Sequence, residues 1–258
     1  MTTRPHVQTC VIPAGLYTIG DDALAISRPA HQIDFAGGHI SVTAITNGDF
    51  HHFIAADGYT TERYWTQIGW RWQKNRQESQ PAFWDESRFN HALQPVVGVT
   101  WYEAVAFANW LQELTGQPWQ LPSEAAWEIA TRPNPTDQQT TDQPNRPAPK
   151  QMNTAEQGIG RPWAAIGRGQ VSWCGGRDLL GNIWEWTASR WGRNWQSLDY
   201  PYPYQPDDGR EDLSGSHARV MRGGSWFDPL KAANASNRGR YLPGSRGSNI
   251  GFRLFHPQ

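Results

Sequence analysis

The sequence is poor in cysteine, in long apolar runs and in excess charge of either sign. Its 258 residues include two cysteines, which excludes a disulfide framework. The 23 Lys and Arg residues nearly balance the 24 Asp and Glu residues, so nothing suggests a surface for nucleic acid or anionic membranes. No apolar segment is long enough to cross a bilayer, and the N-terminus lacks an apolar signal segment. We therefore expect a cytoplasmic protein.

Tryptophan is abundant instead, with 15 residues. Each large ring buries much apolar surface, so a loop-rich domain can assemble its core from them. The polar, proline-rich stretch 132–150 has no apolar anchor and predicts a mobile loop inside a domain. The run Tyr200–Tyr204 predicts an extended segment that displays its tyrosines.

Local signals predict several secondary-structure elements. Residues 11–20 and 31–45 have the turns and alternation of paired strands. Thr46 and Asp49 have the spacing of a capping box, as do Thr100 and Glu103. A further helix begins at Pro122-Ser123 and ends before Pro133, whereas the tryptophans of 64–85 suggest simple packing.

Four motifs occur in one order along the chain. They are Leu121-Pro-Ser-Glu-Ala-Ala-Trp-Glu128, Leu180-Gly-Asn-Ile-Trp-Glu-Trp186, Arg219-Val-Met-Arg-Gly-Gly-Ser-Trp226 and Asn249-Ile-Gly-Phe-Arg253. Together they resemble the formylglycine-generating-enzyme (sulfatase-modifying-factor) family, whose domain is a variant of the C-type lectin fold. The resemblance implies one α+β domain over residues 1–258, C-type-lectin-like and loop-rich, with short antiparallel strands and two to three helices.

The resemblance also implies where a copper site would lie. Family members that oxidise a peptidyl cysteine bind copper through two cysteines that follow the Arg-Gly-Gly-Ser-aromatic motif, since soft thiolates suit Cu(I). The matching positions here are Asp228 and Ala233. We therefore expect no copper and no catalytic residue of that kind.

A second branch of the family, the ergothioneine-type sulfoxide synthases, adds an N-terminal helical bundle with iron-binding histidines. We expect no such bundle here, because the sequence starts at the lectin-like motifs, and the eight histidines show no HxxxH spacing. A metal-dependent oxidase or oxygenase with other ligands stays an alternative.

Calcium is the cofactor that the resemblance does imply. The positions that match the family's calcium ligands are Asn153, Asn182 and Glu185. Calcium prefers six to eight oxygen ligands, which loops can supply. The alternatives are a turn role for Asn182 beside Gly181 and a buried ion pair of Glu185 with an arginine such as Arg222.

Residues 226–248 combine small polar residues with a few aromatics, a composition typical of adaptable recognition surfaces. The segment also resembles the variable region of proteins diversified by retroelements, although Lys231 does not fit mutagenised Asn codons. The alternative is a loop that fills a former active-site cleft. We expect one exposed face built from Trp226, Phe227, Asp228, Asn234, Ser236, Tyr241 and Ser245, held from beneath by Arg222, Asn237 and Arg253.

The favoured function is therefore a catalytically silent domain that binds a protein or small ligand through this C-terminal face. A diversity-generating-retroelement variable protein is one form of that hypothesis. A regulatory scaffold for a separate effector protein is a further alternative.

Overall fold

The computed structural model describes residues 5–133, 148–164 and 169–258, so most of the loop predicted at 132–150 lies outside the described residues. The α-helices are α1 (Asn47–Ala55), α2 (Gln67–Arg76), α3 (Trp101–Thr115) and α4 (Glu124–Thr131). The strands are β1 (Thr9–Ile12), β2 (Gly15–Ile19), β3 (His31–Phe35), β4 (Gly38–Ser41), β5 (Trp184–Gly192), β6 (Ala218–Arg222), β7 (Gly239–Tyr241), β8 (Ile250–Phe252) and β9 (Phe255–His256). Single 3-10 turns occur at Glu62–Tyr64, Pro149–Gln151, Ala155–Gln157 and Leu230–Ala232.

The strands form three small sheets, with orders β1-β4-β9, β2-β3 and β7-β6-β5-β8. This mixture of helices and mainly antiparallel strands confirms the predicted α+β class. One pairing, β5 with β8, is parallel. Strands β1 and β2 follow each other in the chain but belong to different sheets, because β1 pairs with β4 and β2 with β3.

The predicted helix starts are present. Thr46 accepts a hydrogen bond from Asp49 N, and the Asp49 side chain accepts from Thr46 N, which completes the capping box of α1. Thr100 and Glu103 do the same for α3. Helix α2 was missed by the sequence reading, because it is polar on most sides and packs only through a few residues.

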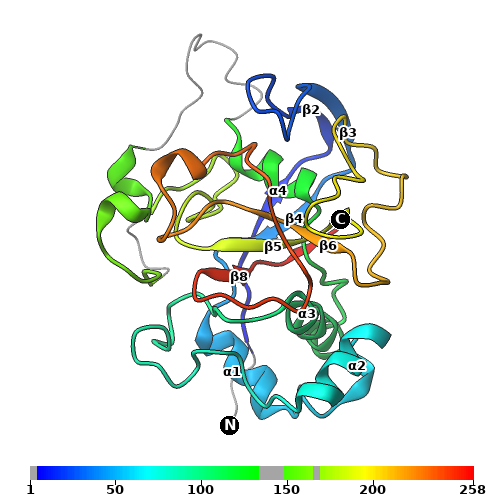
Figure 1. The fold of residues 1–258 in the computed structure, drawn as a ribbon, viewed down its shortest axis with the longest axis vertical. Coiled ribbons are helices and arrows are strands. Elements are labelled where there is room, and N and C mark those ends of the chain that lie inside the picture. The colour runs from blue at the N-terminus through cyan, green and yellow to red at the C-terminus, as the bar shows by residue number, and fades with distance from the viewer. Residues whose placement is uncertain (1–4, 134–147, 165–168) are drawn as a thin grey trace.

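Helix α4 lies between the β2–β3 hairpin and the four-stranded sheet, and α3 lies on the opposite side of that sheet (Figure 1). Each side has its own core. Phe50, Phe107 and Phe252 pack together beside α3, with ring centroids 5.4 and 5.5 Å apart. Trp127 and the strand residues Ile12 and Ile19 belong to the core on the α4 side. Strand β5 therefore separates two apolar layers.

The prediction that residues 200–204 display their tyrosines is wrong, because Tyr202 and Tyr204 are buried. The Tyr202 hydroxyl donates to Glu128, and the Tyr204 hydroxyl donates to Glu211. Both rings fill the core on the α4 side. Among the helices that the structure describes, none has the length and apolar character needed to cross a bilayer.

Candidate functional site

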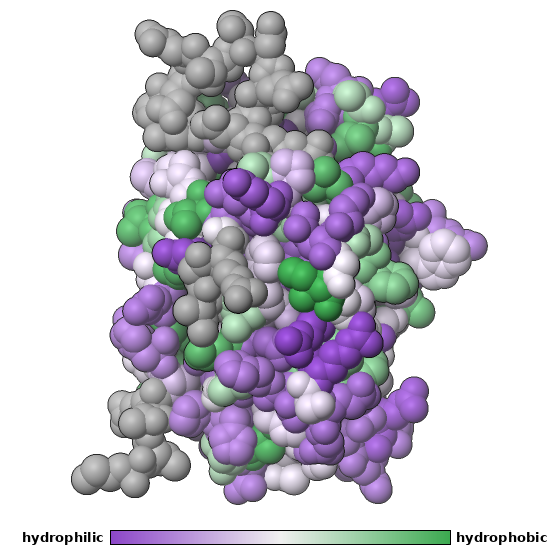
Figure 2. Space-filling model, turned by 90° about the vertical axis from the view of Figure 1, so that its left-hand side faces the viewer, coloured by the Kyte–Doolittle hydropathy of each residue, from purple (hydrophilic) through white to green (hydrophobic). Residues whose placement is uncertain are grey.

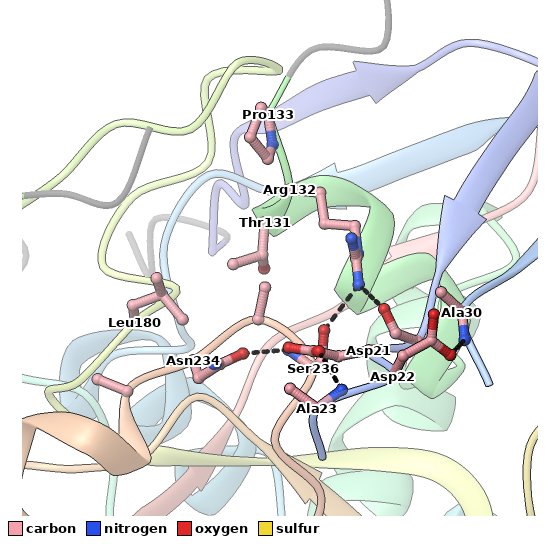
Figure 3. Close-up of a pocket in the computed structure, with 13 residues that line it drawn as sticks. Asp21, Asp22, Ala23, Ala30, Thr131, Arg132, Pro133, Leu180, Asn234 and Ser236 are labelled. Carbon is pink, nitrogen blue, oxygen red and sulfur yellow. Dashed lines mark hydrogen bonds between the residues drawn. The ribbon is translucent and has the colours of Figure 1, made fainter. Parts of the chain in front are cut away.

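A pocket of about 550 Å³ opens beside the C-terminal end of α4 (Figure 3). Four parts of the chain line it: the loop after β2, the end of α4, Leu180 and residues 233–236. The lining residues are Gly20, Asp21, Asp22, Ala23, Ala30, Thr131, Arg132, Pro133, Leu180, Ala233, Asn234, Ala235 and Ser236. Segments more than 200 residues apart in sequence, such as Gly20 and Ser236, thus meet in one cavity.

Arg132 is the cationic group of this pocket. Its Nη2 donates to Ser236 Oγ at 2.7 Å and to the carbonyl of Gly20, and its Nε donates to Glu128 Oε1 at 2.9 Å. Figure 3 shows the guanidinium pointing toward the loop after β2. Among the described residues its Nη1 has no hydrogen-bond partner, so the group can still donate to a ligand.

Glu128 holds the wall behind the pocket together. Its carboxylate is fully buried and accepts five hydrogen bonds. The donors are Gly20 N (2.8 Å), Arg132 Nε (2.9 Å), Ser236 Oγ (3.1 Å), Tyr202 Oη (3.0 Å) and Arg222 Nη2 (2.5 Å). Burial alone would raise the pKa of Glu128, but Arg222 and Arg132 outweigh it and hold the pKa below its usual value.

Glu124, one helical turn earlier, anchors the next part of the C-terminal segment. Arg238 binds it bidentately, with Nε at 2.7 Å and Nη2 at 2.8 Å. Arg210 approaches at 3.4 Å, and Arg222 lies 3.9 Å away. All four side chains are almost wholly buried. This network was not predicted from the sequence. Two carboxylates spaced i, i+4 on a short apolar helix are the signal that could have indicated it, because buried carboxylates require cationic partners.

The predicted recognition residues do not share one face. Asn234 and Ser236 line the pocket, where Asn234 Oδ1 accepts from Ser236 N at 2.8 Å. Ser236 is buried rather than exposed, because Glu128 and Arg132 bind its hydroxyl. Phe227 and Tyr241 are exposed, by 69% and 50%, outside the pocket lining.

The prediction that Trp226 lies on an exposed face is also wrong, since its side chain is buried. Its ring packs 6.3 Å from that of Phe89 and receives the guanidinium of Arg88 at 5.4 Å. Its Nε1 donates to the carbonyl of Ser248. Ser245 is half-buried in a turn closed by its own N–H and the carbonyl of Leu242. The apolar area of Trp226 therefore stabilises the segment instead of contacting a ligand.

The predicted frame residues occupy interior positions. Arg222 and Arg253 are fully buried and ion-paired. Asn237 is half-buried, and its Nδ2 donates to the carbonyl of Ala232 at 3.0 Å.

The two positions that match the copper ligands have other partners. Asp228 accepts hydrogen bonds from Trp184 Nε1 at 2.9 Å and from the Ser225 hydroxyl. Ala233 is buried and lines the pocket. Neither position offers a thiolate, and the carboxylate at the first one is already bound within the fold.

The residues proposed for calcium do not fit the ion as they stand. Both oxygens of Glu185 accept from Arg253, and Oε2 also accepts from Trp127 Nε1. Asn182 Oδ1 accepts from Asn153 Nδ2 and Trp163 N, which uses both of its lone pairs. The ion-pair alternative for Glu185 is therefore correct, but its partner is Arg253 and not Arg222.

Asn182 also has the turn role that was considered for it, since its φ of 63° is left-handed. Asn153 Oδ1 is buried and has no partner among the described residues. Close by, Asp178 was missed by the sequence reading. Burial raises its pKa to about 6, although Trp163 Nε1 donates to it at 3.1 Å. Across the described ranges, no three His, Cys, Asp or Glu side chains gather as a metal site.

A family model described as a sulfatase-modifying factor enzyme 1-like domain matches residues 2–257. The chain belongs to this family. The hercynine oxygenase of Mycobacterium tuberculosis is 33% identical over 77% of the chain and 48% of its own length. The chain spans about half the length of each hercynine oxygenase that it matches.

Two further members or neighbours extend this comparison. The inactive C-alpha-formylglycine-generating enzyme 2 of Mus musculus is 29% identical over 94% of the chain and 83% of its own length. The solved structure of Treponema denticola variable protein 1 superposes with a TM-score of 0.69, covering 97% of this chain and 95% of the other, at 20% identity. This superposition confirms the fold predicted from the resemblance and carries no functional statement.

Proposed function

We propose that this domain binds a small ligand in the pocket beside α4 and does not generate formylglycine. The main support for this proposal comes from Ala233. This residue occupies the position that matches the second copper cysteine, bears only a methyl group and lines the pocket. At this one of the two copper-matching positions, the chain has a cavity with a guanidinium, an amide and a hydroxyl around apolar walls. A few polar groups in a mostly apolar cavity are typical of ligand sites.

The charges around the pocket favour a small zwitterion. Arg132 can donate from Nη1, which suits a carboxylate. Asp21 and Asp22 lie in the loop after β2, toward which the Arg132 guanidinium points, and each uses Oδ1 to accept a backbone N–H from Ala23 or Ala30. Their Oδ2 atoms have no partner among the described residues and suit a cationic end.

The experiment compares thermal unfolding with and without millimolar glycine betaine, free amino acids and trimethylated amino acids. Binding to the native state alone raises the melting temperature. Ala23→Trp would fill the pocket mouth from an exposed position. The control is Ala25→Trp, at a residue of the same loop that is also exposed but lies outside the lining. We expect a shift in wild type and Ala25→Trp that is lost in Ala23→Trp. Equal shifts in both variants, or none with any compound, would contradict the proposal.

Protein recognition by the exposed aromatics is the second part of the proposal. Phe227 and Tyr241 are largely solvent-exposed although each has an aromatic side chain. On the face drawn in Figure 2, the described hydrophobic residues form separate groups among hydrophilic ones, which suits contacts by single anchors. If retroelement diversification shaped this segment, the flanking DNA holds a near-repeat of the codons for 226–253 that differs mainly at adenines.

A metal-dependent oxygenase is the alternative function, and the identity with hercynine oxygenases favours it. The test is oxygen consumption by iron-loaded protein in the presence of thiol and the same compounds. Turnover that depends on iron would replace the binding proposal.

A further inference from the structure

The two cysteines, 164 residues apart in sequence, meet in the folded chain. Cys10 Sγ lies 3.6 Å from Cys174 Sγ. Cys10 is on β1, and Cys174 is at the tip of a small hairpin in which Val171 bridges Arg177. Both residues are partly exposed and both are free thiols. We propose that Cys10 and Cys174 form a reversible disulfide that joins β1 to the hairpin at 171–177.

The hairpin is fixed in place by bonds that do not involve sulfur. Gly175 N donates to the Ser172 carbonyl at 2.9 Å, which closes the turn. Arg177 N donates to the Val42 carbonyl at 2.6 Å, and Trp173 Nε1 donates to the Ile129 carbonyl at 2.9 Å. These contacts attach the tip to the segment after β4 and to α4. The sulfur atoms therefore meet through the fold itself and not through a chance rotamer.

The backbone approaches closely enough for a bridge. A Cβ placed on Gly175 would lie 3.5 Å from Cys10 Cβ, so the turn packs directly on β1. Gly175 has a φ of 100°, a left-handed conformation that glycine adopts without strain. A disulfide needs sulfur atoms about 2.05 Å apart. The remaining gap is small and lies between two side chains on fixed backbones.

The environment makes Cys174 the attacking group. Cys10 donates a hydrogen bond to its sulfur, which lowers the pKa of Cys174 to about 6, while burial acts in the opposite direction. The Ser172 hydroxyl lies 3.3 Å from the same sulfur. The same pairing raises the pKa of Cys10. A thiolate beside a protonated thiol is the arrangement of an attacking and a resolving cysteine.

The oxidant is a low-molecular-weight disulfide such as oxidised glutathione. The Cys174 thiolate attacks one glutathione sulfur, forms a mixed disulfide and displaces one glutathione thiolate. The Cys10 sulfur then attacks Cys174 Sγ, loses its proton to solvent and displaces the second glutathione thiolate. Two protein thiols are oxidised, and one glutathione disulfide is reduced to two glutathiones.

The full chain is equilibrated in glutathione buffers of graded redox ratio, quenched with acid and alkylated. Mass spectrometry should then find two alkyl groups per chain under reducing conditions and none under oxidising conditions. The oxidised protein should be a monomer whose mass is lower by two hydrogen atoms. Peptide mapping should show the Cys10–Cys174 cross-link, and dithiothreitol should reverse it. The melting temperature should rise on oxidation, because the bridge restricts the unfolded chain.

Cys10→Ser and Cys174→Ser separate the two roles, and their melting temperatures check the fold. Cys10→Ser should accumulate glutathione on Cys174 faster than Cys174→Ser does on Cys10, because the Ser172 hydroxyl beside Cys174 Sγ still lowers the pKa of Cys174 when Cys10 is absent. Wild-type protein that keeps both thiols, carries two glutathiones or forms only intermolecular disulfides overturns the proposal. So does reduced protein that binds one Cu(I) per chain through the pair and then resists oxidised glutathione, which would make it a metal site.

Discussion

Arg253 binds the carboxylate of Glu185 bidentately, with Nε 2.6 Å from Oε2 and Nη2 2.7 Å from Oε1. Both side chains are buried. Paired, parallel hydrogen bonds of this kind are the strong form of an ion pair. A calcium ion at Glu185 would have to displace the guanidinium and leave it buried without the carboxylate that neutralises it, although backbone carbonyls such as that of Ser41 would still accept from it.

The melting temperature should therefore be the same in excess chelator and in millimolar calcium. Thermal unfolding monitored by tryptophan fluorescence measures this directly. A calcium-dependent rise would mean that the ion displaces Arg253, or that it binds Asn153 Oδ1 together with loop carbonyls.

Glu128→Gln should lower the free energy of unfolding by about 3–5 kcal/mol, because it leaves Arg222 buried without its closest counter-charge. Chemical denaturation provides the value. The control is Glu113→Gln, which removes an ion pair with Arg63 at the surface, where solvent screens the charges. If the two variants unfold alike, Glu128 does not hold the network.

Glu211 should produce a stability change between acidic and neutral pH. Burial raises its pKa to about 7, and its Oε2 is buried with no partner among the described residues. An unfolded glutamate titrates near 4.3. The folded state therefore holds the proton more tightly than the unfolded state does. The stability that Glu211 contributes in this way is fully present below about pH 4.3 and is lost as the pH rises through 7.

Glu211→Gln keeps a neutral group at that position. The loss of melting temperature between pH 5.5 and pH 8 should be smaller in this variant than in wild type. Asp178, whose pKa is also raised, supplies part of the remaining slope. An unchanged slope would mean that Glu211 titrates normally in the folded protein.

Trp226 and Phe227 are adjacent aromatic residues, but the first is buried and the second is exposed, so their alanine variants can be compared directly. Trp226→Ala should cost about 3–5 kcal/mol of stability, as large-to-small core substitutions do. Phe227→Ala should stay within about 0.5 kcal/mol, as surface substitutions do. Only Phe227→Ala and Tyr241→Ala should weaken partner binding without loss of stability. Similar unfolding midpoints for Trp226→Ala and Phe227→Ala would contradict this assignment.

The protein should not convert a cysteine-containing sulfatase peptide to formylglycine in the presence of copper. Asp228 and Ala233 provide no thiolate, and Asp228 is bound to Trp184 and Ser225. Hydrazide capture detects the aldehyde product. Any aldehyde above a peptide-only control would refute the proposed loss of this chemistry.

The parts of the fold that sequence reasoning predicted well depend on local chemistry or on family motifs. Capping residues such as Thr46 and Thr100 act on backbone groups three residues away, so their spacing alone predicts the helix start. Helix α2 has no comparable apolar stripe, and its tryptophans suggested packing without a direction. The α+β class followed from the order of four motifs and not from composition.

The candidate site was harder to predict, because its contacts are long-range. Nothing in the motif around Glu185 chooses between Arg222 and Arg253, since the structure brings both strands beside β5. Ser236 and Trp226 have recognition-type side chains, but α4 and Phe89 bury them. Cys10 and Cys174 gave no signal, because only the docked hairpin brings them together.

Most of the arginines that neutralise the buried carboxylates of α4 come from distant parts of the chain, and this affects how freely the C-terminal segment can move. Apart from Arg132, the arginines that bind Glu124 and Glu128 come from positions 86 to 114 residues further along the chain. Uncompensated buried carboxylates are costly, so α4 cannot remain packed once the segment around Arg238 detaches. Helix and segment should unfold together, in one cooperative step. If residues 226–248 bind a partner as we propose, the segment cannot loosen to fit it, and the two surfaces have to be complementary before they meet.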